Sequence, residues 1–145
     1  MIIKTRHVGL IVKNIIKSKK FYGKILGLKL KKELIEEGKY FNSLIGLKKS
    51  KAKVVKIDLP DKTYIELIEF EKPKSSQKVK IEKFSKLKQM HICFTVKNIH
   101  NYFKRLRKNK IKFISPPLKS DFDPVSTCFF LDPDYNYVQI VEDHR

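Results

Sequence analysis

Hydrophobic and polar residues along this chain follow two different spacings. Apolar residues at alternate positions or in short runs predict a β-strand, whereas apolar residues at every third or fourth position predict an amphipathic helix. Strands are predicted on this basis for residues 7–12, 28–35, 54–59, 64–70, 90–96, 111–114, 127–131 and 137–141. Helices are predicted for residues 15–26, 40–47 and 99–106. Gly27 is predicted to end the first helix, because glycine is favoured just beyond a helix C-terminus.

The order of these predicted elements occurs twice. The segment HVGLIVKNI at 7–15 aligns without a gap with HICFTVKNI at 91–99, so each half opens a strand with a histidine and enters a helix through the same four residues. A repeat of a whole supersecondary unit decides the fold before any single motif does. We therefore predict an α+β fold with two tandem βαβββ modules in a single domain over residues 1–145: module one at 1–71, a polar, Lys-rich connector at 72–88 and module two at 89–145.

Length and composition fit one domain. The chain has 145 residues, 41% of them hydrophobic, which is enough to bury a core, and no apolar run is long enough to cross a bilayer. Residues 1–20 carry basic side chains throughout and no sustained apolar stretch, so we expect no signal peptide and a cytoplasmic location. Cys93 and Cys128 form no CxxC pair. We expect both to be small buried hydrophobic residues and not zinc ligands.

The charge balance is strongly basic, with 33 Lys and Arg against 15 Asp and Glu and a net charge of +18. Such a balance suits nucleic-acid binding when the basic residues cluster on one helix and include arginines that contact bases and phosphates. Here nearly all the basic residues are lysines spread along the chain, and no nucleic-acid-binding motif is present. We interpret the charge as a solvated surface that attracts anionic small molecules, and not as a nucleic-acid site.

Several short segments carry a family resemblance when they are taken in order. They are HVGLIV at 7–12, Phe21-Tyr22, Leu26-Gly27-Leu28, IELIE at 65–69, His91 and FFLDPD at 129–134. With them the chain resembles the vicinal oxygen chelate superfamily, also called the glyoxalase, bleomycin-resistance and dioxygenase superfamily, over nearly its whole length. The resemblance implies that the two modules curl their mixed sheets into a cup around a divalent metal ion, which could be Ni, Co, Mn, Zn or Fe.

The resemblance also implies the metal ligands, which come from the first and fourth strands of each module: His7, Glu66, His91 and Gln139. Strand alternation agrees with this set, because Glu66 shares a face with Tyr64 whereas Glu69 points the other way. Gln139 is likewise expected on the face opposite to Glu142.

The chain departs from the family pattern near its end. Most relatives have a Glu after an Asp-Pro-Asp-Gly-Asn turn, whereas this chain has Tyr135 at the Gly position and Gln139 at the Glu position. We expect Tyr135 to force a different turn, because glycine adopts a positive φ without strain. Two imidazoles, one carboxylate and one amide oxygen still suit a first-row divalent metal with open positions for substrate oxygens.

The function implied by the resemblance is that of a metal-dependent lyase or isomerase, similar to lactoylglutathione lyase or to acyl-CoA epimerases. Such an enzyme chelates adjacent substrate oxygens and stabilises an enediolate after Glu66, or a metal-bound water, has moved a proton. The implied substrate is anionic, either a thiol adduct of a 2-oxoaldehyde or an acyl-CoA, and the implied assembly is a homodimer. Two alternatives stay open: a metal-poor binding protein similar to the bleomycin-resistance members, and a ring-cleaving dioxygenase, which Gln139 disfavours because that chemistry relies on a final-strand Glu.

Overall fold

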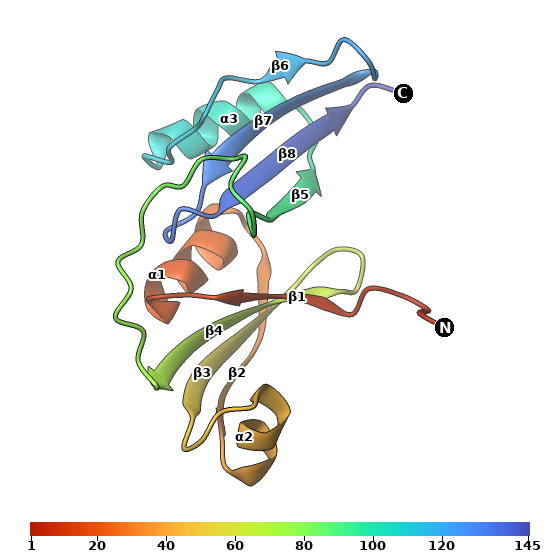
Figure 1. The fold of residues 1–145 in the computed structure, drawn as a ribbon. Helices are drawn as coiled ribbons and strands as arrows, with labels where there is room; N and C mark the ends of the chain where they lie inside the picture. The colour runs from red at the N-terminus through yellow and green to blue at the C-terminus, as the bar shows by residue number, and fades with distance from the viewer. The chain divides into compact units, whose positions relative to one another are not determined.

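The computed structural model describes residues 1–145, which divide into unit 1, Met1–Lys78, and unit 2, Val79–Arg145. Each unit contains one four-stranded mixed sheet together with helices (Figure 1). This arrangement confirms the predicted α+β class and the two tandem modules. None of the helices has the length and apolarity needed to span a bilayer.

Unit 1 holds a sheet with the strand order β1-β4-β3-β2, in which β1 is parallel to β4 and the other neighbours are antiparallel. Its elements are β1 at His7–Ile11, α1 at Ile15–Lys19, a π-helical continuation η1 at Lys20–Ile25, β2 at Lys29–Glu37, α2 at Lys39–Ile45, β3 at Lys51–Asp58 and β4 at Tyr64–Lys72. The helix α1 packs against β3 and β4 (Figure 1). Residues of β4 that face this helix, such as Ile65 and Leu67, are completely buried.

Local chemistry explains where the first helix begins and ends. The side chain of Asn14 accepts a hydrogen bond from the backbone N–H of Lys17 at 2.9 Å and so caps the helix start. A carboxylate oxygen of Glu69, on the fourth strand, accepts another from the backbone N–H of Ile15 at 2.7 Å. Beyond the π-helical turns, Gly27 takes a φ of +84°, as predicted for the residue that ends this helix.

Unit 2 repeats the same topology with the strand order β5-β8-β7-β6, in which β5 is parallel to β8. Its elements are β5 at His91–Thr95, α3 at Ile99–Lys108, β6 at Leu118–Lys119, β7 at Val125–Leu131 and β8 at Tyr137–Asp143. Glu142 on the last strand accepts hydrogen bonds from the backbone N–H groups of Asn98, at 2.6 Å, and Ile99, at 3.1 Å. A last-strand glutamate therefore satisfies the free N–H groups at a helix start in both units.

One predicted strand is wrong. Residues 111–114 contribute only an isolated bridge between Phe113 and Phe130, and the edge strand β6 forms later, at Leu118–Lys119. The reason is Pro116-Pro117, which removes two backbone N–H donors between the bridge and β6. The edge of this sheet is therefore short and irregular.

Tyr135 adopts a positive φ although it carries a side chain. Its φ is +65°, in the left-handed region that favours glycine. The carboxylate of Asp132 holds the turn by accepting hydrogen bonds from the backbone N–H groups of Asp134, at 2.9 Å, and Asn136, at 2.8 Å. These bonds offset the steric cost of a side chain at positive φ.

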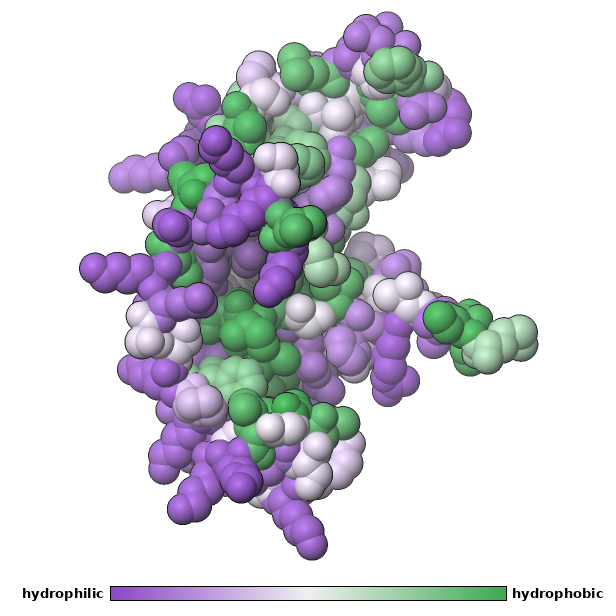
Figure 2. Space-filling model, viewed as in Figure 1, coloured by the Kyte–Doolittle hydropathy of each residue, from purple (hydrophilic) through white to green (hydrophobic).

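Hydrophilic side chains project from every part of the face shown in Figure 2, with apolar side chains scattered between them. Some lysines of the chain are paired with acids, for example Lys53 with Glu71 at 3.1 Å and Lys19 with Glu33 at 2.9 Å. The positive charge is thus distributed over many elements of both units.

Candidate metal centre

The first pair of predicted ligands meets on one face of the unit 1 sheet. His7 and Glu66 lie on the parallel neighbours β1 and β4, and His7 Nε2 is 3.6 Å from Glu66 Oε2. Gly9, whose Cα pairs with that of Glu66, carries no side chain that could separate the two groups. Two donors that share one metal ion through bonds of about 2.0–2.2 Å lie roughly 3–3.5 Å apart. The pair therefore fits two positions of a metal centre after a small adjustment.

Strand alternation places Glu66 as predicted. Tyr64 and Glu66 are partly exposed on the face that carries His7, whereas Ile65 and Leu67 are completely buried on the other face. Glu69 belongs to the buried face, where it caps the first helix instead of joining His7. We call the surface formed by His7, Lys31, Lys56, Tyr64 and Glu66 the open face of unit 1.

Two lysines and a tyrosine surround the His7 and Glu66 pair. The ring of Tyr64 stacks on the His7 imidazole with centroids 4.9 Å apart. The ammonium groups of Lys31 and Lys56 lie 5.4 Å and 5.2 Å from the centroid of the Tyr64 ring, within the range of cation–π attraction. Lys56 Nζ also lies 3.2 Å from Glu66 Oε1, and the two side chains are only 25% and 17% exposed. The proposed ligand Glu66 is therefore ion-paired with a cation from the neighbouring strand.

The second pair of predicted ligands occupies the equivalent strands of unit 2. His91 lies on β5 and Gln139 on β8, where Gln139 pairs with Cys93 in the parallel register that matches Glu66 and Gly9 in unit 1. The surroundings are aromatic, because the His91 ring contacts Phe129, with centroids 5.2 Å apart, and Phe84, at 5.9 Å. Phe129 pairs with Gln139 as Lys56 pairs with Glu66, so an aromatic residue replaces the lysine in this half.

The orientation of the Gln139 amide is fixed by a threonine. Thr127 Oγ1 donates its only hydrogen to the carbonyl oxygen of Ile140 at 3.0 Å, so it can only accept from Gln139. The atom facing it, at 2.8 Å, is accordingly the amide nitrogen Nε2. The carbonyl oxygen Oε1, which is the atom a metal ion would need, points away from Thr127.

Neither unit alone gathers three His, Cys, Asp or Glu side chains around one point. The structure thus brings His7 to Glu66 within unit 1 and places His91 and Gln139 on the equivalent strands of unit 2. The set of four ligands stays a prediction.

The cysteines differ from expectation in one case. Cys128 is buried as predicted, and burial raises the pKa of its thiol to about 11. Cys93 is exposed, because alternation along β5 puts it on the same face as His91. Partial desolvation still raises the pKa of the Cys93 thiol, so both cysteines carry a proton at neutral pH.

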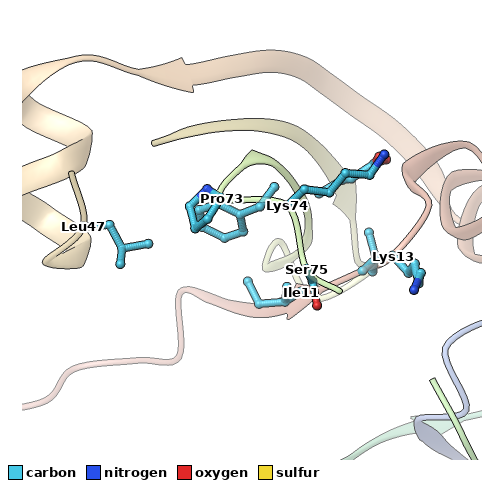
Figure 3. Close-up of a pocket in the computed structure, with 9 residues that line it drawn as sticks. Ile11, Lys13, Leu47, Pro73, Lys74 and Ser75 are labelled. Atoms are coloured by element: carbon cyan, nitrogen blue, oxygen red, sulfur yellow. The ribbon is translucent and has the colours of Figure 1, made fainter. Parts of the chain in front are cut away.

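A separate hollow in unit 1 opens near the ends of β1 and β4 and has a volume of about 260 Å³. Figure 3 shows residues that line it, among them Ile11, Leu47 and Pro73, together with the lysines Lys13 and Lys74. Its lining is mainly apolar and includes no predicted ligand. The hollow is therefore distinct from the His7 and Glu66 pair.

We expect acid to lower the stability of the fold partly by protonating Glu142. The two backbone N–H groups at the start of α3 stabilise the ionised carboxylate and hold the pKa of Glu142 below its usual 4.5. Because the folded pKa is depressed, this contribution is complete well above pH 4.5 and is lost as the pH falls through the lowered value. We expect Glu142→Gln to flatten the loss of stability below pH 4.5 in urea unfolding followed by circular dichroism. Glu36→Gln, at a residue with no ion pair, should leave the acid profile unchanged, and equal profiles for both variants would contradict the capping role.

Comparison with known proteins identifies the family of this chain. The sequence model of the Glyoxalase/Bleomycin resistance protein/Dioxygenase superfamily matches residues 4–140. The chain therefore belongs to this superfamily. A comparison with curated proteins gives no match.

Solved structures show the same fold. A glyoxalase family protein from Bacillus cereus superposes with a TM-score of 0.86 at 19% identity, covering 98% of this chain and 95% of the other. A glyoxalase/dioxygenase from Nostoc punctiforme has a TM-score of 0.71 at 26% identity, with coverage of 98% and 92%. The trypanothione-dependent glyoxalase I of Leishmania major has a TM-score of 0.68 at 18% identity, with coverage of 97% and 86%. The glyoxalase-like fold is thus shared at low sequence identity.

Proposed function

We propose that this protein is a metal-dependent lyase or isomerase of the glyoxalase or epimerase type. The observation that carries the proposal is the His7 and Glu66 pair, in which an imidazole nitrogen and a carboxylate oxygen lie 3.6 Å apart on the open face of unit 1. The repeated histidine His91 and the amide of Gln139 occupy equivalent strands in unit 2. These four residues would hold one divalent ion, with Ni, Co, Mn, Zn and Fe all compatible with the mixed donor set.

A metal ion at this centre would supply a Lewis acid that polarises a substrate carbonyl. The residues of the chain would supply the base that accepts a proton and the positive charge that attracts the substrate. The carboxylate of Glu66 lies beside His7 on the open face of unit 1 and could take a proton from the carbon next to the carbonyl. Lys31 lies on the same face, where it pairs with Asp58 at 3.0 Å, and would turn from this partner to the anionic end of a thiol adduct or an acyl-CoA. We also propose a homodimer, on the family resemblance alone, and a cytoplasmic location.

The metal content of the purified protein tests this function. We expect about one ion per chain when the protein is prepared without chelator, or after addition of nickel, cobalt, manganese or zinc. The loaded protein should then exchange deuterium from solvent into the carbon next to the carbonyl of a hemithioacetal or a 2-substituted acyl-CoA. A metal content well below one per chain that added metal cannot raise would end the enzyme proposal.

A second candidate function is metal-independent binding of a flat apolar compound. It is favoured by the aromatic cluster of unit 2, in which the Phe84 ring lies 5.1 Å from Phe129 and 5.0 Å from Tyr137. The Tyr137 hydroxyl also donates to the carbonyl of Glu82 at 2.7 Å, which holds the segment that carries Phe84. Aromatic clusters bind planar ligands by stacking. Compound binding that persists unchanged after chelator treatment would support this candidate over the enzyme.

We expect Thr127 to affect metal affinity through its hydrogen bond with the Gln139 amide. Thr127→Val removes the acceptor that orients the amide, so Oε1 would no longer be held in one direction, and we expect metal affinity to fall by about tenfold. Thr127→Ser keeps the hydroxyl and should stay near the original affinity. Competition with a chromophoric chelator measures both values. Equal weakening by serine and valine would show that the methyl group, and not the hydrogen bond, is what matters.

A further inference from the structure

Lys56 forms an ion pair with one carboxylate oxygen of the proposed ligand Glu66. Its ammonium nitrogen lies 3.2 Å from Oε1, while His7 approaches the other oxygen, Oε2, at 3.6 Å. The lysine and the glutamate are mostly buried side chains, so solvent screens their interaction less than it would screen an exposed pair. A divalent cation that binds Glu66 must therefore approach a carboxylate that already has a cation beside it.

The fold does not require a lysine at this place. In unit 2 the equivalent position, opposite the proposed ligand Gln139, is filled by Phe129. At this strand position a charged residue is thus present only in unit 1, the unit that carries the carboxylate ligand. The remaining partner of Lys56 is the ring of Tyr64, 5.2 Å from its ammonium group, which offers a second resting place on the same face when the ion pair is broken.

We propose that Lys56 is an internal competitor for metal, which lowers the affinity of the centre for a divalent ion and leaves Glu66 when the ion binds. This inference rests on the proposed function, because it takes Glu66 as a metal ligand. Displaced from Glu66, Lys56 remains over Tyr64 and keeps its positive charge beside the centre. There it would favour substrates that carry a carboxylate or phosphate group near the reacting carbon.

The expected effect follows from Coulomb's law. A divalent ion and an ammonium group about 5 Å apart repel each other strongly enough, even at a high effective dielectric constant, to change an affinity by more than tenfold. Removing the charge with Lys56→Met should therefore tighten Ni²⁺ binding by at least about tenfold, and the gain should shrink as salt is added. Lys56→Arg keeps the charge and should stay within about threefold of the unmodified protein.

Isothermal titration calorimetry with Ni²⁺ on the full chain measures these affinities, and thermal unfolding checks that each variant is folded. Lys53→Met is the matched control, because Lys53 lies on the same strand and pairs with Glu71 at 3.1 Å, away from Glu66. It should leave the affinity within about twofold. If the unmodified protein binds Ni²⁺ and Lys56→Met binds no more tightly, the competitor role is overturned while the metal centre stands. If neither protein binds Ni²⁺, the proposed function fails and this inference fails with it.

Discussion

Replacing Glu66 with alanine should abolish stoichiometric metal binding, whereas replacing Glu142 should leave the metal content unchanged. Glu66 is the only carboxylate in the proposed ligand set and lies 3.6 Å from the His7 imidazole. Loss of residues that merely orient metal ligands costs about 10- to 100-fold in affinity, so loss of a charged ligand should cost at least about 100-fold. Elemental analysis after dialysis against metal-free buffer measures the outcome.

Glu142 is a demanding control for this experiment. It lies three residues after Gln139, just as Glu69 lies three residues after Glu66, but its carboxylate is turned to the start of α3. Glu142→Ala should lower stability while the metal content stays near that of the unmodified protein. Metal loss in Glu142→Ala with retention in Glu66→Ala would contradict the assignment. It would mean that the metal ligands lie on the opposite face of the last strands.

Phe130→Ala should lower the free energy of unfolding by about 3–5 kcal/mol. Phe130 is completely buried, pairs with Val138 across β7 and β8, and packs its ring 5.2 Å from that of Phe113. Truncation removes a large apolar side chain from a site that β8 and Phe113 prevent from collapsing. Urea unfolding followed by circular dichroism measures the change.

Phe122→Ala is the matched control, because it makes the same substitution at an exposed position of unit 2. Its side chain is 96% exposed, so Phe122→Ala should change stability by no more than about 0.5 kcal/mol. A cost below about 1 kcal/mol for Phe130→Ala would show that β7 does not bury this ring in the folded protein.

The pairing of His7 with Glu66 could be anticipated because it depends on local rules. Side chains alternate along a strand, so placing Ile65 and Leu67 in the core puts Glu66 on the other face. The alignment of 7–15 with 91–99 likewise gives the two-module topology, because each copy has to build the same supersecondary unit.

The contact of Lys56 with Glu66 was not predicted, although the sequence carries a signal for it. Pro60-Asp61-Lys62 lies in the turn that joins β3 to β4, and the register of this hairpin sets Lys56 directly opposite Glu66. Cys93 was misjudged for a related reason, since an apolar run such as that of β5 does not say which positions face the core. The edge strand β6 depends on two prolines that interrupt pairing, and its position could not be read from hydrophobicity.

The most direct measurement is an anomalous difference map from crystals soaked with nickel or cobalt. We predict one strong peak per chain within about 2.0–2.3 Å of His7 Nε2 and a Glu66 oxygen, with His91 and the Gln139 carbonyl oxygen completing the coordination. A map with no peak at His7 and Glu66, or with the metal held by other side chains, would contradict the proposed centre.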